Sequence, residues 1–330
     1  MALISSRIVE GEKIAIAPPC RKFMEVAKAN LELEEEYIDL SRRITDFFST
    51  VLEETPIVLT DNVTEYLYGT EAQRSNAKWD LADLPVVVPP FTSVFLETKS
   101  PRDTAKQDVS AWGAFFSRSD EASDIGNSEI GADDVKWLVE MSLLFDDKGV
   151  IKTHPVVYGF FLDSQGQFLT DSGEGILFET YMLAREELAE VIEGDPQWEG
   201  RQKSSIDMAL PFFFSFAFMH CKNVSLVPPH VSRQVKRQAE RSGKPLLDYR
   251  ILNIEPMKAI LKKEGNLDEV GPKTALHICR GHFKDYRDGP GLFGKLRGVY
   301  WWEGSVRGSL SRGKVEKDYK VNPPTQKPDA

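Results

Sequence analysis

Residues 137–166, WLVEMSLLFDDKGVIKTHPVVYGFFLDSQG, hold two runs of β-branched and aromatic residues, each followed by a polar, glycine-containing turn sequence. Runs of this composition between turn-forming residues are typical of antiparallel strands. Two earlier runs have the same texture, TSVFLET at residues 92–98 and AWGAFFS at residues 111–117. We therefore expect an antiparallel meander between residues 85 and 162.

Helical patterns lie on either side of this block. The apolar residues before it recur at intervals of three and four, which predicts a long N-terminal amphipathic helix closed by Pro56. They are Leu33, Tyr37, Leu40, Ile44, Phe47 and Val51. After the block, residues 181–192 and 205–220 are expected to be helical. The second contains MALPFFFSFAFM at 208–219, a run too short to cross a bilayer and better suited to a buried helix.

These elements together predict an α+β fold in which an antiparallel sheet is packed against helices. We expect three regions along the chain. Residues 1–85 form a helical N-terminal region, and residues 86–320 form an α+β body that includes a basic, aromatic segment at 273–320. Residues 321–330 are rich in proline and polar residues, which predicts a disordered tail.

Composition narrows the class of protein. Hydrophobic residues make up 41% and charged residues 28% of the 330, as in ordinary soluble domains. The three cysteines are far apart in sequence, which argues against a disulfide framework and fits a reducing cytoplasm. No signal peptide is recognisable at the N-terminus, so no membrane partner is expected.

The net charge of −10 is unevenly distributed, because residues 273–320 contain eleven Lys/Arg against five Asp/Glu. Within this segment, residues 276–308 read LHICRGHFKDYRDGPGLFGKLRGVYWWEGSVRG. If residues 276–286 form one strand, Arg280, His282, Lys284 and Tyr286 share a cationic face. A cationic surface on an acidic chain indicates directed contact with a polyanion or a peptide.

A second strand is expected at residues 299–307, VYWWEGSVR. Its alternation should bury one of the adjacent tryptophans and leave the other partly exposed. The candidate binding residues of the whole segment are His277, Arg280, Gly281, His282, Phe283, Lys284, Tyr286, Arg287, Trp301, Trp302 and Arg307.

The sequence supports a catalytic or cofactor-binding site less well than a binding surface. His277 and His282 are five residues apart, a spacing that favours no shared metal ion on a strand or a helix. The stretch GPGLFGK at 289–295 lacks the Ser/Thr of a P-loop, since Leu296 follows. No metal or cofactor is therefore expected. One alternative stays open: a metal-independent RNase in which His282, Arg280 and Tyr286 position phosphate and exchange a proton.

The same residues resemble a known family, the second type V-A anti-CRISPR family of phages and mobile genetic elements. The resemblance rests on the motif His277-Ile278-x-Arg280-Gly281-His282, followed by the aromatic residues Phe283 and Tyr286. Residues 299–306, 84–98 and 210–221, the last followed by Val231-Ser232-Arg233, fall in the family's order.

The resemblance implies a non-enzymatic regulator in the cytoplasm of a bacterial host. Its partner would be a nascent target polypeptide, such as the N-terminus of a CRISPR effector nuclease, with the ribosome or mRNA nearby. Binding would lower synthesis of the target through translation-dependent loss of its mRNA. A third hypothesis is an RNA-binding accessory protein of a mobile element.

Overall fold

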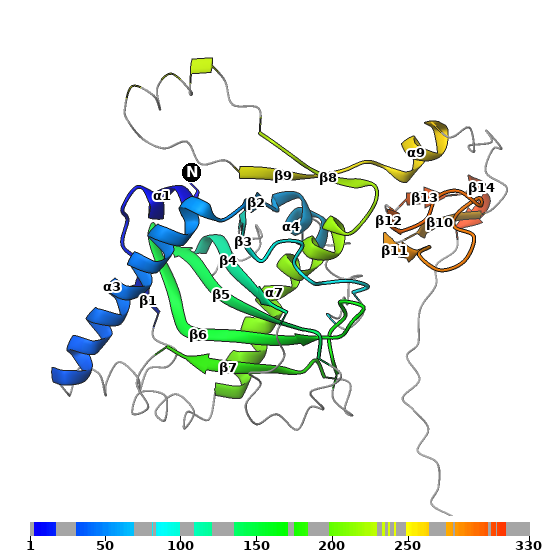
Figure 1. Ribbon diagram of the computed structural model, residues 1–330. Coiled ribbons are helices and arrows are strands. Elements are labelled where there is room, and N and C mark those ends of the chain that lie inside the picture. Colours follow the sequence, from blue (N-terminus) through cyan, green and yellow to red (C-terminus); the bar gives the residue numbers. More distant parts are fainter. Residues whose placement is uncertain are drawn as a thin grey trace, which may run out of the picture. The chain divides into compact units, whose positions relative to one another are not determined.

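A computed structural model describes a large part of the chain (Figure 1). The described residues are 3–17, 31–68, 81, 84–99, 109–120, 135–170, 175–183, 198–229, 233–234, 237, 241, 249–263, 275–279, 281–302, 305–307 and 309–314. The chain divides into two compact units, Met1–Ile254 and Glu255–Ala330. The tail expected at 321–330 lies outside the described residues.

A nine-stranded sheet forms the centre of unit 1. Its order is β1 (Ala15–Ile16), β6 (Val150–Leu162), β5 (Trp137–Asp147), β4 (Val109–Ser119), β3 (Ser93–Lys99), β2 (Ile57–Leu59), β9 (Tyr249–Ile254) and β8 (Val224–Val227), with β7 (Phe178–Met182) also paired to β6. The α+β class and the antiparallel β3-β4-β5-β6 meander are confirmed. The sheet is nevertheless mixed, because β2 runs parallel to both of its neighbours.

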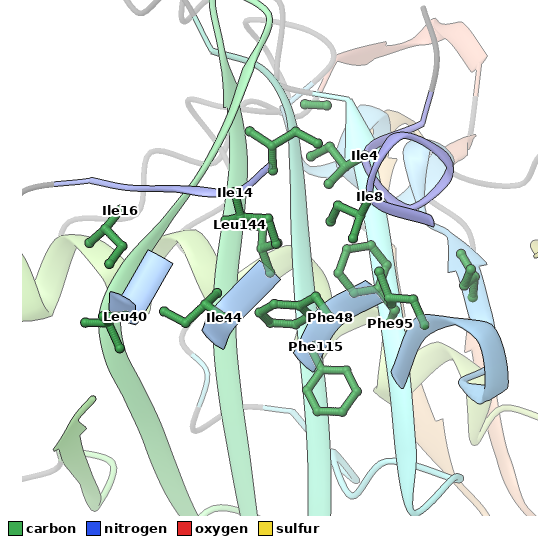
Figure 2. Close-up of a cluster of buried hydrophobic side chains, with 14 residues drawn as sticks. Ile4, Ile8, Ile14, Ile16, Leu40, Ile44, Phe48, Phe95, Phe115 and Leu144 are labelled. Atoms are coloured by element: carbon green, nitrogen blue, oxygen red, sulfur yellow. The ribbon is translucent and has the colours of Figure 1, made fainter. Parts of the chain in front are cut away.

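Two helices, α1 (Ile4–Val9) and α3 (Leu31–Glu54), cover one face of this sheet. Figure 2 shows Leu40, Ile44 and Phe48 of α3 against Phe115 of β4 and Phe95 of β3. The ring of Phe95 lies directly over Gly113, where an added Cβ would come within 2.5 Å of Phe95 Cζ. Glycine in β4 therefore makes room for an aromatic ring in this core.

The predicted apolar stripe of this region was wrong at Phe47, whose side chain is 51% exposed, whereas Phe48 is buried. Adjacent residues on a helix point about 100° apart, so only one of the two rings can face the sheet centre. Phe47 instead lies at the edge of the helix face that is turned to the sheet. Its ring touches Phe115 edge-on, with ring centroids 5.8 Å apart. The small helix α4 (Asp61–Tyr68) follows β2.

The opposite face of the sheet is covered by α7 (Trp198–Met219). Phe116, the neighbour of Phe115 in β4, points to this side and meets Phe213 and Phe216 at centroid distances of 5.4 and 4.8 Å. The apolar run of this helix is thus a buried core helix, as expected. Among the described residues, no helix has the length and apolar character needed to cross a membrane.

A helix had been expected from residue 181, and this was wrong at its start. Tyr181 and Met182 belong to strand β7, paired with Val157 and Val156 of β6. The rest of that expected helix, and most of the basic segment 231–242, lies outside the described residues.

Unit 2 contains α9 (Met257–Lys263) and two small sheets. One sheet joins β10 (Ala275–Cys279), β13 (Ser305–Arg307) and β14 (Ser309–Lys314); the other pairs β11 (His282–Asp285) with β12 (Val299–Trp302). The single strands predicted at 276–286 and 299–307 were wrong, because each is divided between the two sheets. Strand alternation therefore does not carry from His277 to His282.

A buried carboxylate attaches α1 to the sheet. Glu97 of β3 is 2% exposed and accepts hydrogen bonds from the backbone N–H of Ile4 at 2.6 Å and of Ser5 at 3.2 Å. It also accepts a bond from the Ser5 hydroxyl at 2.8 Å. Burial raises the pKa of Glu97, and the hydrogen bonds from Ile4 and Ser5 oppose that rise. The carboxylate thus satisfies donors that the first turn of a helix leaves unpaired.

We predict that Glu97→Ala destabilises the fold by about 3 kcal/mol, since two buried backbone N–H groups would lose their acceptor. Thermal and urea unfolding of the full chain would measure the loss. Ser5→Ala in the same background is the control, because the two changes should be strongly non-additive. Additive effects would show that the contact between α1 and β3 does not depend on this carboxylate.

Candidate functional site

The paired strands β11 and β12 carry the residues that the sequence singled out. His282 lies opposite Trp302, Phe283 opposite Trp301, and Lys284 opposite Tyr300. The ladder is extended by a bond from the Tyr286 N–H to the Gly298 carbonyl at 2.9 Å. Residues directly opposite each other in an antiparallel pair share a face. The two strands therefore present two chemically different surfaces.

The inner surface is apolar. Trp301 is 1% exposed, and its ring packs against Phe283 with centroids 4.8 Å apart. Trp302 is only half-buried, which confirms that the two tryptophans differ in exposure. Trp301 was a candidate binding residue, but its side chain is buried and packs on the inner surface of the two strands. Gly281, another candidate, is buried where the chain enters β11.

The other surface, which we call the cation–aromatic face, consists of His282, Lys284, Tyr286 and Trp302. Tyr300, opposite Lys284, lies on the same side of the strands but is buried, with 6% of its side chain exposed. The ammonium of Lys284 lies 4.5 Å from the centroid of the Trp302 ring, a cation–π geometry. Tyr286 and Tyr300 lie side by side with centroids 6.2 Å apart. His282 is exposed. The face therefore combines two potential hydrogen-bond donors with flat aromatic surface.

Arg287 contributes less free charge than expected. Its guanidinium Nε and Nη2 donate to both carboxylate oxygens of Asp285, at 2.7 to 3.1 Å. The pair lowers the pKa of Asp285 and raises that of Arg287. Because its charge is balanced locally, Arg287 is less available to a phosphate than Lys284.

The remaining candidates are separated from this face. His277 of β10 pairs in register with Arg307 of β13, in the other small sheet. Arg280 lies outside the described residues, so the common face predicted for Arg280 and His282 is not defined. Sequence alternation placed His282, Lys284 and Tyr286 together correctly, but it could not detect the break that precedes His282.

The glycine-rich connection between β11 and β12 is tightly turned. Gly291 has a φ of +79°, and a Cβ there would lie 2.9 Å from the Leu296 carbonyl oxygen. Phe293 also has a positive φ, 53°, and is 55% exposed. A non-glycine residue in this conformation is uncommon and strained. The loop thus holds an aromatic ring out beside the exposed cations Lys295 and Arg297.

Sequence reasoning missed a pair of carboxylates in unit 1. Glu140 of β5 and Glu179 of β7 both lie opposite Gly159 of β6. One oxygen of Glu179, Oε1, is shielded from water and has no hydrogen-bond partner in the described part of the chain. Burial, and then the charge of Glu140, raise the pKa of Glu179. Only strand register brings these residues together, because they are 39 positions apart in sequence.

Other reactive groups in the described residues have structural surroundings. Burial raises the pKa of the Cys221 thiol to about 12, so it is protonated at neutral pH and a poor nucleophile. His220 Nε2 bonds to the Val88 carbonyl at 2.7 Å. No group of three or more His, Cys, Asp or Glu side chains within the described ranges is placed to hold a metal ion.

Comparison with protein-family models, curated proteins and solved structures finds no match to this chain. The inference of function therefore depends on the geometry above and on the resemblance of the R-G-H motif.

We predict that Glu179→Gln raises the melting temperature at pH 7.5. The folded-state pKa of Glu179 lies above its ordinary value, so its ionised form opposes folding at pH values above that pKa. The gain should shrink towards pH 4, where the native carboxyl is protonated. Melting curves across this pH range would measure it. Glu53→Gln, at an exposed position, is the control; equal gains from both variants would contradict the assignment.

Proposed function

We propose that this chain is a non-enzymatic regulator that binds a target polypeptide through the cation–aromatic face of β11 and β12. In line with the anti-CRISPR resemblance, the target is a polypeptide under synthesis, whose mRNA is lost as a consequence of recognition. The supporting observation is the placement of Lys284 over Trp302, with the exposed His282 on the same face.

The chemistry of this face suits a peptide. Lys284 and His282 can donate hydrogen bonds to backbone carbonyls or carboxylates of a partner, while the ring of Trp302 offers apolar contact. Tryptophan and tyrosine are enriched among the residues that dominate binding energy. The apolar packing of Trp301 on Phe283 holds the strands in place behind them, which reduces the entropy lost on binding.

Local ion pairing favours a peptide over RNA. Residues 273–320 hold eleven Lys/Arg against five Asp/Glu, but Arg287 is paired with Asp285. Non-specific RNA binding depends on neutralising many phosphates. RNA binding by an accessory protein is the second candidate function. The observation in its favour is that the half-buried rings of Tyr286 and Trp302 lie on one face, since bases stack on such rings.

The test is a pull-down with the tagged full chain from a translating bacterial lysate. We expect released nascent peptides to co-purify after RNase and puromycin treatment, and capture to survive moderate salt. Lys284→Glu should reduce capture at least about tenfold, since a charge-assisted hydrogen bond contributes on the order of 1.5–3 kcal/mol. Lys295→Glu, an exposed cation of the neighbouring loop, is the matched control and should bind as the native chain does.

Other outcomes select a different function. RNA binding would be established instead if RNase abolished the capture of partners and if capture fell steeply between 50 and 200 mM salt. Metal-independent RNA cleavage by the purified chain, lost in His282→Ala, would establish the RNase alternative. Circular dichroism of each variant separates these results from misfolding.

A further inference from the structure

Helix α3 covers only part of its face of the sheet in unit 1. Ser117, two residues after the buried Phe115 of β4, lies on the same face and is half-buried. Its partner in β5 is Glu140, whose partner in β6 is Gly159, whose partner in β7 is Glu179. These four positions, which we call the carboxylate row, cross four neighbouring strands on the face that carries α3.

Gly159 lets side chains from both neighbouring strands lean over β6. A Cβ at this glycine would lie 3.0 Å from Tyr181 Cε2, 3.2 Å from Glu179 Cγ and 3.3 Å from Leu138 Cδ1. The ring of Tyr181 is 37% exposed, and Leu183, two residues further along the chain, is 40% exposed. The carboxylates therefore lie among aromatic and aliphatic side chains that are open to solvent.

The two glutamates differ in how their oxygens are satisfied. Glu140 Oε2 accepts a hydrogen bond from the Ser117 hydroxyl at 3.0 Å. Glu179 Oε1 is shielded from water and has no hydrogen-bond partner in the part of the chain that the structure describes. A shielded carboxylate oxygen without a donor costs free energy, and a second negative charge nearby increases that cost. A cation beside the pair would stabilise both carboxylates.

The surrounding elements supply no such cation among the described residues. The positions of β4, β5, β6 and β7 that alternate onto this face include no Lys, Arg or His. The basic residues of α1 and α3 are Arg7, Arg42 and Arg43. Arg7 is bound to Asp146, and both arginines of α3 are bound to Asp39. The carboxylate row is therefore complementary to a positively charged partner.

We propose that the carboxylate row binds a Lys or Arg side chain of a partner polypeptide. Strands β5 and β7 are about 10 Å apart across β6, so a cationic group fits between Glu140 and Glu179. Its aliphatic stem would pack on Leu138 and Tyr181, as long basic side chains commonly do on apolar surface.

The apolar surroundings favour a peptide over a metal ion. Two carboxylates and one hydroxyl would leave most of the oxygen ligands of Ca²⁺ or Mg²⁺ to water. The exposed Leu183 and the half-buried Val157 on this face suit apolar residues beside the Lys or Arg. This site lies in unit 1, uses none of the residues of the cation–aromatic face and does not depend on the proposed function.

A display library of nine-residue peptides, panned against the full chain, tests the proposal. We expect enrichment of Lys or Arg beside apolar residues. A synthetic copy of an enriched peptide is then the probe, and norleucine or citrulline in place of its basic residue should weaken binding at least about tenfold. Glu140→Gln and Glu179→Gln should each weaken binding of the charged peptide. Glu53→Gln removes an exposed carboxylate of α3 and is the matched control, which should bind as the native chain does.

Thermal stability separates a binding role from a structural one. Glu179→Gln is expected to melt at a higher temperature than the native chain, so weaker peptide binding by this variant would not come from misfolding. Three results would overturn the proposal: no enrichment of basic residues, glutamine variants that bind the peptide as tightly as the native chain, or equal binding of the norleucine peptide. A concentration-dependent dimer that Glu179→Gln abolishes would also overturn it and assign the row to a second copy of this chain.

Discussion

The fold depends on burying two adjacent aromatic rings that point in opposite directions. Phe115 and Phe116 are consecutive in β4, and strand geometry sends them to opposite faces of the sheet. Phe115 packs with Phe48 of α3, and Phe116 packs with Phe213 and Phe216 of α7. A sheet with such a central strand needs a helical layer on each side. The amphipathic α3 and the apolar C-terminal half of α7 supply the two layers.

The two layers are anchored by different chemistry. The α7 side is held by aromatic rings in edge-to-face contact, including Phe160 with Phe213 at 4.8 Å. The α3 side adds polar anchors, among them Ser5 and Glu97, which are 0% and 2% exposed. A carboxyl group in that position is stable only because three donors from the start of α1 surround it. The position of α1 therefore depends on the position of β3, which carries Glu97.

The surface proposed for the target polypeptide lies in unit 2. The cation–aromatic face is a side-chain surface, whose specificity would come from Lys284 and Trp302.

Local patterns in the sequence were sufficient for several features. Alternating β-branched and aromatic residues predicted the four strands of the meander, and the run of phenylalanines predicted a buried helix, because these signals depend only on near neighbours. The unequal exposure of Trp301 and Trp302 followed from strand alternation alone. The grouping of His282, Lys284 and Tyr286 on one face had the same origin.

Tertiary structure decided the features that depend on pairing between residues far apart in the sequence. The choice of Phe48 over Phe47 reflects the rotation of α3 against Phe115, which no periodicity of the helix itself specifies at its margin. The break between Cys279 and His282 arises because β10 and β11 find different partners. The proximity of Glu140 and Glu179 across Gly159 exists only through strand register. Local sequence determined the meander and the two long helices; long-range register decided which faces meet, because pairing energy depends on residues far apart in the chain.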